Sequence, residues 1–451
     1  MLNFPLKYLA GFLILAAIYI IKNPGAVTGT KETPTQNLIQ NSSLNNNLQS
    51  KETEPNDKNN FAASRNNGLQ DKVIPEKDNL SRDYLKLHYS SIVVDTHNDF
   101  IWKVFDKGAV FGKHNSFTQS DLPRFKEGGV DVQFFAVWIP MKKLKSSFSF
   151  VEGQIGRLRE IEQNNSNDIE FAGDYNGLMN VLSKNKMCGL IGVEGGTAIG
   201  NDINNVNRLY DLGVRYIGLT WNNSNNIAVS ARDQTEGGKK GGLTEFGKQV
   251  VQRMNELGIM VDAAHLGEDA FWDVLNISDK PVFSSHSNCY TINPHYRNLT
   301  DDQIKAIAKS GGVVQVNFYD EFLDKNARLQ RTENAYDKYG PELNAMNEKY
   351  GDDLEEFNKR RDEFIESKHI SGGTNVDKVI EHIDYIVQLV GIDYVGLGSD
   401  FDGGISPPVE LYDASCYPVI TKKLVEKGYS DEAIKKILGL NLLRVFKQVC
   451  G

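Results

Sequence analysis

Short apolar runs alternate with longer amphipathic segments along the chain from about residue 80 onward. Runs rich in β-branched and aromatic residues predict strands that are buried on both faces of a parallel sheet. The segments between them predict helices, for example over 245–257 and over 301–310, the latter with Thr300 as N-cap and Gly311 at its end. Eight runs are found, at 92–95, 132–139, 189–194, 216–221, 259–265, 281–286, 313–318 and 394–400.

Eight strands that alternate with helices over about 370 residues predict an α/β fold, a (β/α)₈ barrel of the TIM type. A doubly wound open sheet is the alternative. The barrel is favoured because no Gly-x-Gly-x-x-Gly fingerprint follows the first run, and because polar residues follow nearly every run. The charged segment from residue 320 to about 369 predicts a helical insertion between strands 7 and 8, either over the barrel mouth or in a dimer contact.

The first 80 residues differ in composition from the rest of the chain. An apolar run from 8 to 21 follows a single Lys7 and predicts a signal peptide or N-terminal membrane anchor over 1–22. Residues 23–80 are rich in Asn, Ser, Thr, Lys and Glu and predict a flexible linker, with the barrel domain over 81–451. We therefore expect an exported protein of the periplasm or cell envelope, attached to the membrane if the leader is not cleaved.

Charge and cysteine usage exclude several classes of protein. The net charge of −9 and the absence of a Lys/Arg-rich run argue against binding to nucleic acid. The four cysteines are far apart and form no Cys-x-x-Cys pair, which argues against a zinc ribbon or a redox motif. One or two disulfides would be permitted in an exported protein.

Metal-binding side chains follow five of the predicted strands. They are His97 and Asp99 after the first run, Glu194 after the third, His265 after the fifth, His286 after the sixth and Asp400 after the eighth. Residues two apart on a strand point to the same side, so His97 and Asp99 are expected to point together. The other histidines are read as surface or packing residues, except for His295, whose place in a loop near the site is ambiguous: His88, His114, His369 and His382.

Five of these side chains could hold two cations if Glu194 bridges them, because it lies between the other two pairs around the ring. Two metal ions about 3.5 to 4 Å apart can polarise a carbonyl and generate hydroxide from water, which is chemistry for hydrolysing an amide. Asp400 would then accept the proton from water and donate it to the departing amine. A mononuclear site, a modified-lysine bridge and a polar mouth without an ion are alternatives; no Lys ends any of the first six runs, and burying such groups without an ion is unfavourable.

Seven ordered motifs resemble those of the membrane (renal) dipeptidase family. They are VDTHND (94–99), GVEGG (192–196), VDAAH (261–265), FSSHS (283–287), RN (297–298), VNF (316–318) and GSDFDG (398–403). The resemblance implies an amidohydrolase-like barrel that hydrolyses dipeptides with two Zn²⁺ ions and forms a homodimer. It implies His97 and Asp99 on one zinc, His265 and His286 on the other, and Glu194 as the bridge. It also implies Asp400 as the proton shuttle and Arg297 as the partner of the substrate carboxylate.

Trp221 departs from the family pattern. Mammalian members have a histidine after the fourth strand that contacts the substrate near its scissile carbonyl, so oxyanion stabilisation here is expected from zinc, Asn222 or a water. Asp95 and Asp262 resemble groups that orient the neighbouring ligands. Two alternatives remain, a related dinuclear hydrolase of other small amides or lactones, and a non-catalytic envelope binding protein, although none of the five ligands is missing.

Overall fold

Parallel strands form the centre of the fold. The computed structural model describes residues 81–451 except 352, 369, 371 and 372, so the predicted leader, the predicted linker and His369 lie outside the described residues. Five strands pair in the order β1-β2-β4-β5-β6, and β7 pairs with β8. The strands are β1 (Val93–Asn98), β2 (Val130–Trp138), β3 (Ile169–Phe171), β4 (Met187–Glu194), β5 (Val214–Gly218), β6 (Met260–Asp262), β7 (Val314–Val316) and β8 (Val395–Leu397).

Three isolated parallel bridges join the two groups of strands into a ring. The bridges are Asp262–Phe283, Ser284–Val314 and Asn98–Phe401. The sixth predicted run, 281–286, therefore takes its expected place in the ring through two bridged residues rather than as a full strand. This order is that of a (β/α)₈ barrel and not of an open sheet. The short strand β3, which was not predicted, pairs only with the start of β4 and lies outside the ring.

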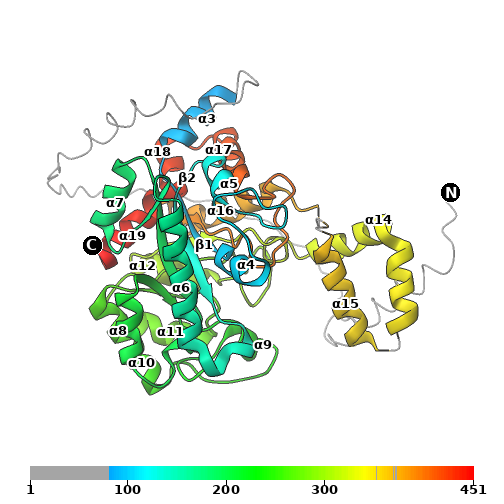
Figure 1. Cartoon of the computed structure of the whole chain (residues 1–451), viewed down its shortest axis with the longest axis horizontal. Coiled ribbons are helices and arrows are strands. Elements are labelled where there is room, and N and C mark those ends of the chain that lie inside the picture. Colours follow the sequence, from blue (N-terminus) through cyan, green and yellow to red (C-terminus); the bar gives the residue numbers. More distant parts are fainter. Residues whose placement is uncertain (1–80, 352, 369, 371–372) are drawn as a thin grey trace, which may run out of the picture. The chain divides into compact units, whose positions relative to one another are not determined.

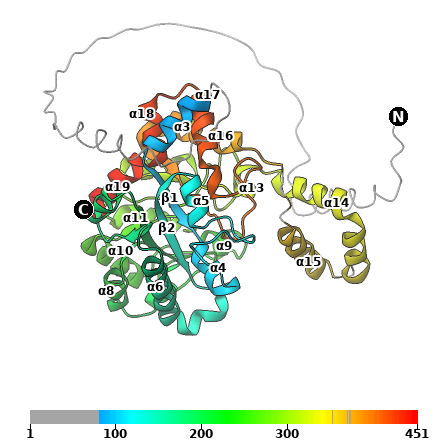
Figure 2. The ribbon, with the colours of Figure 1, turned by 45° about the horizontal axis from the view of Figure 1, so that its top comes forward.

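Most of the helices lie around the ring (Figure 1, Figure 2). They are α3 (Ser81–Ser90), α4 (Phe100–Lys107), α5 (Leu122–Glu127), α6 (Ser147–Asn164), α7 (Tyr175–Ser183), α8 (Asn204–Asp211), α9 (Ala231–Thr235), α10 (Glu245–Leu257), α11 (Glu268–Ile277), α12 (Asp301–Lys309), α13 (Asp320–Leu323), α14 (Ala327–Tyr350), α15 (Leu354–Ser367), α16 (Val376–Val390), α17 (Tyr417–Glu426), α18 (Asp431–Lys435) and α19 (Asn441–Cys450). The helix predicted over 245–257 is α10. At α12, Thr300 and Gln303 form the reciprocal bonds of a capping box, and Gly311 adopts a left-handed conformation just after the helix.

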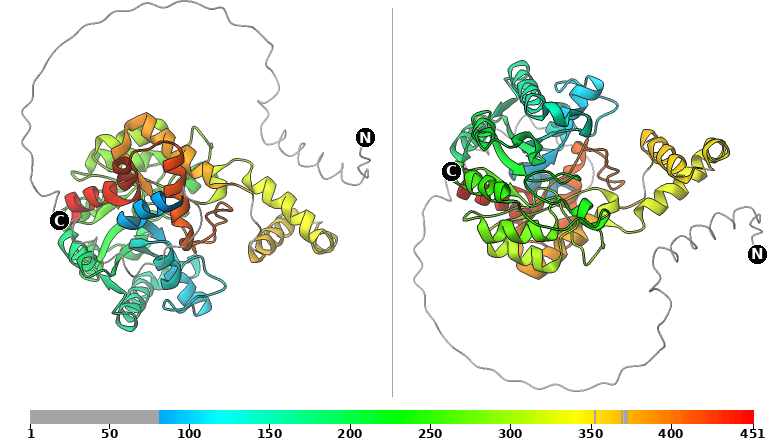
Figure 3. Two further views of the ribbon diagram at one scale, coloured as in Figure 1. Left: turned by 90° about the horizontal axis from the view of Figure 1, so that it is seen from above. Right: turned by 90° about the horizontal axis from the view of Figure 1, so that it is seen from below.

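The C-terminal helix α19 closes the amino-terminal end of the barrel. Its buried residues, including Phe446, belong to the same apolar cluster as Val94, Phe134 and Met260 from the first halves of the strands. The rings of Phe446 and Phe134 meet edge to face with centroids 6.0 Å apart. In Figure 3, α19 lies at the red end of the ribbon. Since this end is filled with apolar side chains, polar chemistry is restricted to the opposite mouth.

The charged segment between β7 and β8 is helical, as its composition predicts. Helices α14 and α15 pack on each other through a small apolar cluster of Ala335, Leu343, Ile365 and Ile370. Helix α14 is kinked at Tyr339, two residues before a proline. A role of this pair over the mouth or in a dimer stays a prediction. Among residues 81–451 as described, no helix is both long and apolar enough to span a membrane.

All four cysteines are buried and free, so the permitted disulfides are not formed. Burial raises the pKa of the Cys188 and Cys289 thiols, which keeps them protonated. His88 is buried and bonds to Thr421 and to the backbone of Gly128. These residues serve packing rather than redox or metal chemistry.

Candidate metal centre

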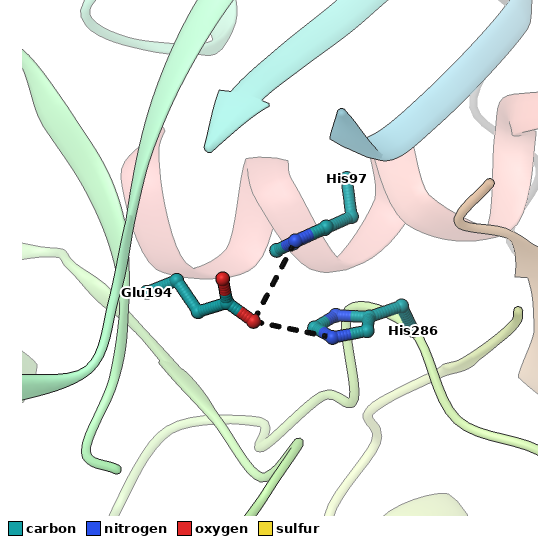
Figure 4. A group of neighbouring side chains, drawn as sticks. All are labelled: His97, Glu194 and His286. Carbon is teal, nitrogen blue, oxygen red and sulfur yellow. Dashed lines mark ion pairs between the residues drawn. The ribbon is translucent and has the colours of Figure 1, made fainter. Parts of the chain in front are cut away.

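The candidate ligands lie together at the carboxyl ends of the strands, at the mouth opposite α19. His97 lies near the end of β1, and Glu194 is the last residue of β4. His265 follows β6, and His286 follows the bridged pair Phe283–Ser284. Figure 4 shows His97 and His286 pointing toward the carboxylate of Glu194. The structure therefore brings together side chains that are almost 190 positions apart in sequence, and all of them are buried.

One carboxylate oxygen is shared by three imidazoles. Oε1 of Glu194 lies 2.9 Å from Nε2 of His265, 3.5 Å from Nε2 of His286 and 3.7 Å from Nε2 of His97. The Nε2 atoms of His265 and His286 are themselves 3.2 Å apart. The rings of His97 and His286 stack with centroids 3.8 Å apart. Such a convergence of donor atoms on one point is what a metal ion requires.

A second group of donors adjoins the first. His97, Asp99 and Asp400 each offer a ligand atom, and these atoms lie within 4.8 Å of one another. Oδ2 of Asp99 is 3.5 Å from Nε2 of His97. His97 therefore belongs to both groups, and the two groups together contain all five predicted ligands and Asp400.

The far side of each imidazole is held by a polar partner. Oγ of Ser285 donates to Oδ2 of Asp262 at 2.6 Å and accepts from Nδ1–H of His286 at 2.7 Å. Nδ1–H of His265 donates to the amide oxygen of Asn222 at 3.1 Å. The expected orienting role of Asp262 thus reaches His286 through Ser285. With hydrogen on Nδ1, the Nε2 atom of each ring presents a lone pair to the centre.

The Tyr216 hydroxyl holds the His97 ring, and the Asp95 carboxylate holds the His97 backbone. Nδ1 of His97 lies 2.9 Å from the Tyr216 hydroxyl, which is buried in the barrel. A Cβ on Gly192 would lie about 2.0 Å from the Tyr216 ring, so only glycine leaves room for this tyrosine. Asp95 accepts from the backbone N–H of His97 at 3.3 Å and from Ser399 at 2.7 and 2.8 Å, which ties β1 to β8.

The donor set fits a cation. Nε2 of His97 is buried and makes no hydrogen bond with the described residues, although it faces two carboxylates. Burial holds the pKa of His265 and of His286 well below the usual value, so both rings are neutral and their facing lone pairs repel. A metal ion between them and Glu194 would satisfy all three groups, and zinc commonly binds this mixture of imidazole and carboxylate.

Two carboxylic acids at the centre are shifted toward the protonated form. Burial raises the pKa of Glu194 to about 8, and the negative charges of Asp99 and Asp400 add to this effect against the opposing charge of His97. Burial also raises the pKa of Asp400 to about 6, while His97 and the Asn317 amide, which donates to its Oδ2 at 2.9 Å, act in the opposite direction. A carboxyl group with a pKa near 6 can exchange protons close to neutral pH.

Arg297 is a buried cation beside the candidate ligands. Its Nη2 donates to the backbone oxygen of His286 at 3.2 Å, and its guanidinium lies 5.4 Å from the centroid of the Phe322 ring. Nε of Arg297 is buried without a hydrogen-bond partner among the described residues. This arrangement leaves part of the guanidinium fork available for a carboxylate.

These side chains line one cavity of about 560 Å³. Its wall also includes the predicted substrate residues Trp221 and Asn222, and the ambiguous His295, whose ring stacks on Tyr296 with centroids 4.5 Å apart. A cavity of this size accommodates a small molecule. The structure thus brings every predicted site residue to a single cavity or into contact with residues that line it.

Some of the residues at the site were not predicted from sequence. Tyr216, Ser285 and Asn317 each hold a candidate ligand or Asp400. Ser285 and Asn317 lie within quoted motifs, but only their contacts assign them a role. Gly403 is a fourth case, since its Cβ would lie about 2.4 Å from Asp400 and 2.7 Å from Asp99, and glycine is required there for the two acids to approach.

Comparison with known proteins identifies relatives of the whole barrel. The family model for membrane dipeptidases (peptidase family M19) matches residues 82–450. An uncharacterized dipeptidase of Schizosaccharomyces pombe is 30% identical in an alignment of 392 residues that covers 83% of this chain and 84% of the relative.

Solved structures share the fold. The dipeptidase AC, a metallopeptidase of family M19, is 26% identical with a TM-score of 0.67, over 80% of this chain and 99% of its own. A metallopeptidase from Rhodobacter sphaeroides, solved with a phosphinate mimic of the dipeptide L-Ala-D-Ala, is 25% identical with the same TM-score and coverage. The probable dipeptidase PvdM from Pseudomonas aeruginosa has a TM-score of 0.69 at 22% identity, over 82% of this chain and 98% of its own.

The family model covers the barrel from α3 to α19. The S. pombe relative independently covers most of both chains at 30% identity. The buried histidines and acids at the mouth could hold a metal ion. This protein therefore belongs to the membrane dipeptidase family, peptidase family M19, a family of metal-dependent dipeptidases.

Proposed function

We propose that the protein is a dinuclear zinc dipeptidase that hydrolyses the peptide bond of dipeptides. One observation carries the proposal, the approach of three imidazole Nε2 atoms to a single oxygen of Glu194 at 2.9, 3.5 and 3.7 Å. A carboxylate in this position suits a bridge between two ions, because each of its oxygens has two acceptor lone pairs. The relatives' names as dipeptidases support the substrate class.

In this proposal His97 and Asp99 bind one zinc ion, His265 and His286 bind the other, and Glu194 binds both. The 3.5 Å separation of the first pair and the 3.2 Å separation of the second support this division. When bound, a pair of zinc ions would lower the pKa of a shared water toward neutrality and polarise the scissile carbonyl.

Asp400 would take a proton from the attacking water and deliver it to the departing amine. Its pKa of about 6, raised by burial, suits a group that accepts and releases a proton in one cycle. The Asn317 amide, bonded to Oδ2 of Asp400, would keep the carboxyl oriented.

Arg297 would bind the C-terminal carboxylate of the dipeptide, and the neighbouring Phe322 ring would keep its guanidinium in place. Asn222 and Trp221 would line the acyl side of the cavity. We further propose that the chain acts as a homodimer after export, held at the cell envelope through residues 1–22 if they are retained. Fractionation and light scattering of the full chain test these two points.

The central experiment measures metal content and turnover of the purified full chain. We expect two zinc ions per chain and hydrolysis within a panel of L-L, L-D and D-D dipeptides. His286→Ala should lose metal and turnover, because it removes a ligand that touches Glu194. Asp400→Asn should keep the metal and lower kcat about 100-fold or more, because the proton shuttle is lost.

His114→Ala is the matched control, since this imidazole is two-thirds exposed and lies outside the centre. It should retain metal and activity. Turnover of N-acyl amino acids or lactones without dipeptides would contradict the dipeptidase assignment, and full activity of Asp400→Asn would contradict the shuttle. A pure chain that binds no metal and cleaves nothing would favour the non-catalytic alternative.

A further inference from the structure

Three tryptophans form a continuous wall on one side of the active-site cavity. Trp102, Trp138 and Trp221 all line it. The rings of Trp102 and Trp138 meet edge to face with centroids 5.1 Å apart, and those of Trp138 and Trp221 with centroids 5.0 Å apart. We call these three residues the tryptophan wall.

The wall adjoins the candidate metal ligands. Trp138 ends β2 and is the register partner of Glu194 in β4. Trp221 directly precedes Asn222, the residue that holds His265. Gly195, directly after Glu194, lies against Trp221 and has a φ of +91°, a backbone conformation that favours glycine. A group bound over Glu194 would therefore contact the wall.

Within the wall, Trp138 ends the strand opposite the bridged pair that precedes Arg297, while Trp102 and Trp221 follow strands on either side of it. Around the ring the order is β1, β2, β4, β5, β6, the bridged pair Phe283–Ser284, β7 and β8. Trp102, Trp138 and Trp221 follow β1, β2 and β5, whereas Arg297 follows the bridged pair. A dipeptide with its C-terminal carboxylate at Arg297 and its carbonyl over Glu194 would extend its N-terminal residue away from Arg297, toward Trp138, the register partner of Glu194.

We propose that the tryptophan wall is the subsite for the side chain of the substrate's N-terminal residue and selects aromatic or large apolar side chains. This inference rests on the proposed dipeptidase function and defines its substrate class. An apolar side chain would be stabilised there by burial of its surface and by contacts with the indole rings. A carboxylate would lose its hydration, and the three tryptophans offer no opposite charge to compensate. Small side chains would leave the wall partly unfilled.

The test compares kcat/KM of the full-length enzyme on Phe-Ala, Leu-Ala, Gly-Ala and Asp-Ala. We expect Phe-Ala and Leu-Ala to exceed Gly-Ala and Asp-Ala by about tenfold or more. Trp221→Ala should bring the Phe-Ala to Gly-Ala ratio close to one. The ratio of Ala-Phe to Ala-Gly, which reports the other end of the substrate, should stay unchanged. Trp221→Phe should retain most of the preference.

Phe105→Ala is the matched control, since this partly exposed aromatic residue lies on the same helix as Trp102 but does not line the cavity. It should leave every ratio unchanged. If Trp221→Ala fails to fold, Trp102→Ala must lower the ratio instead. Equal kcat/KM on Phe-Ala and Gly-Ala, or an equal loss on both in the wall variants, would overturn this inference alone. Failure to cleave any dipeptide would overturn it together with the proposed function.

Discussion

Arg297 combines deep burial with an incomplete set of hydrogen bonds, which is unusual for a cation. Burial lowers its pKa, while the charges of Asp400 and Glu194 act to raise it, so the guanidinium stays charged. We expect Arg297→Ala to raise KM for free dipeptides about 10- to 100-fold, because a bidentate charged contact is lost. Steady-state kinetics on free and C-terminally amidated dipeptides measure the effect, which should be small for the amides.

Arg232 provides the control for this variant. It lines the same cavity but pairs with Glu236 at 2.8 Å on the exposed helix α9. Arg232→Ala should leave KM for free dipeptides nearly unchanged. A similar rise for free and amidated substrates in Arg297→Ala would refute carboxylate recognition.

Residue types differ in how much the sequence reveals about them. Histidines and acids at the ends of apolar runs are visible because such runs rarely end in costly polar groups without a function. Tyr216, Ser285 and Gly192 carry no such signal, since tyrosine, serine and glycine are common in strands and turns. Their roles depend on contacts with residues distant in sequence, such as Gly192 with Tyr216 and Tyr216 with His97.

At the scale of the element, helix α19 contributes to the stability of the barrel but lies away from the candidate metal ligands. Phe446 is fully buried against the amino-terminal half of the barrel, far along the strands from the ligands. Phe446→Ala should lower the free energy of unfolding by about 3–5 kcal/mol through loss of burial and formation of a cavity. Denaturant unfolding of the full chain tests this value.

The exposed Gln448 on the same helix is the control, and Gln448→Ala should change stability by less than about 0.5 kcal/mol. Folded Phe446→Ala protein should still bind its metal. A loss of metal at unchanged stability would contradict the assignment of α19 to the barrel floor.

Seven of the eight predicted runs overlap a strand of the ring, the run 281–286 contributes only two bridged residues, and β3 was not predicted. Two of the predicted strands were too long at their carboxyl ends. The runs predicted over 259–265 and 394–400 form strands only up to Asp262 and Leu397. His265 and Asp400 have positive φ angles of 66° and 64°, which no sheet allows. At these residues the backbone has left the sheet, and both side chains line the cavity. The apolar pattern of the sequence does not show where a strand ends in this way.

At the scale of the whole molecule, the buried acids and histidines at the mouth should make the free energy of unfolding depend on pH and on bound cations. Without ions, the raised pKa values of Glu194 (about 8) and His97 (about 10) mean that the native state holds protons that the unfolded chain releases. Between about pH 7 and 8, stability of the ion-free protein should therefore fall as pH rises. Zinc at 100 times its Kd would add about 2.7 kcal/mol.

We accordingly expect a chelator to lower the thermal unfolding midpoint of the full chain, and more at pH 8 than at pH 7. Scanning calorimetry with and without chelator measures this shift. His286→Ala should respond much less, because one ligand of the centre is already absent. An unchanged wild-type midpoint would argue that the cluster carries no ion that stabilises the fold.

The sequence by itself determined the barrel class, the eight segments that make up the ring and the six polar residues that follow them. These features follow from local patterns, namely apolar runs of strand length and polar residues that end them. Only the tertiary structure decided that Oε1 of Glu194 meets three imidazoles, that Ser285 and Tyr216 hold the rings, and that three tryptophans line the same cavity as Arg297. The physical reason is that distances between these side chains depend on strand register and on closure of the ring. Closure rests on isolated bridges between segments that can lie far apart in sequence, so a local pattern does not specify it.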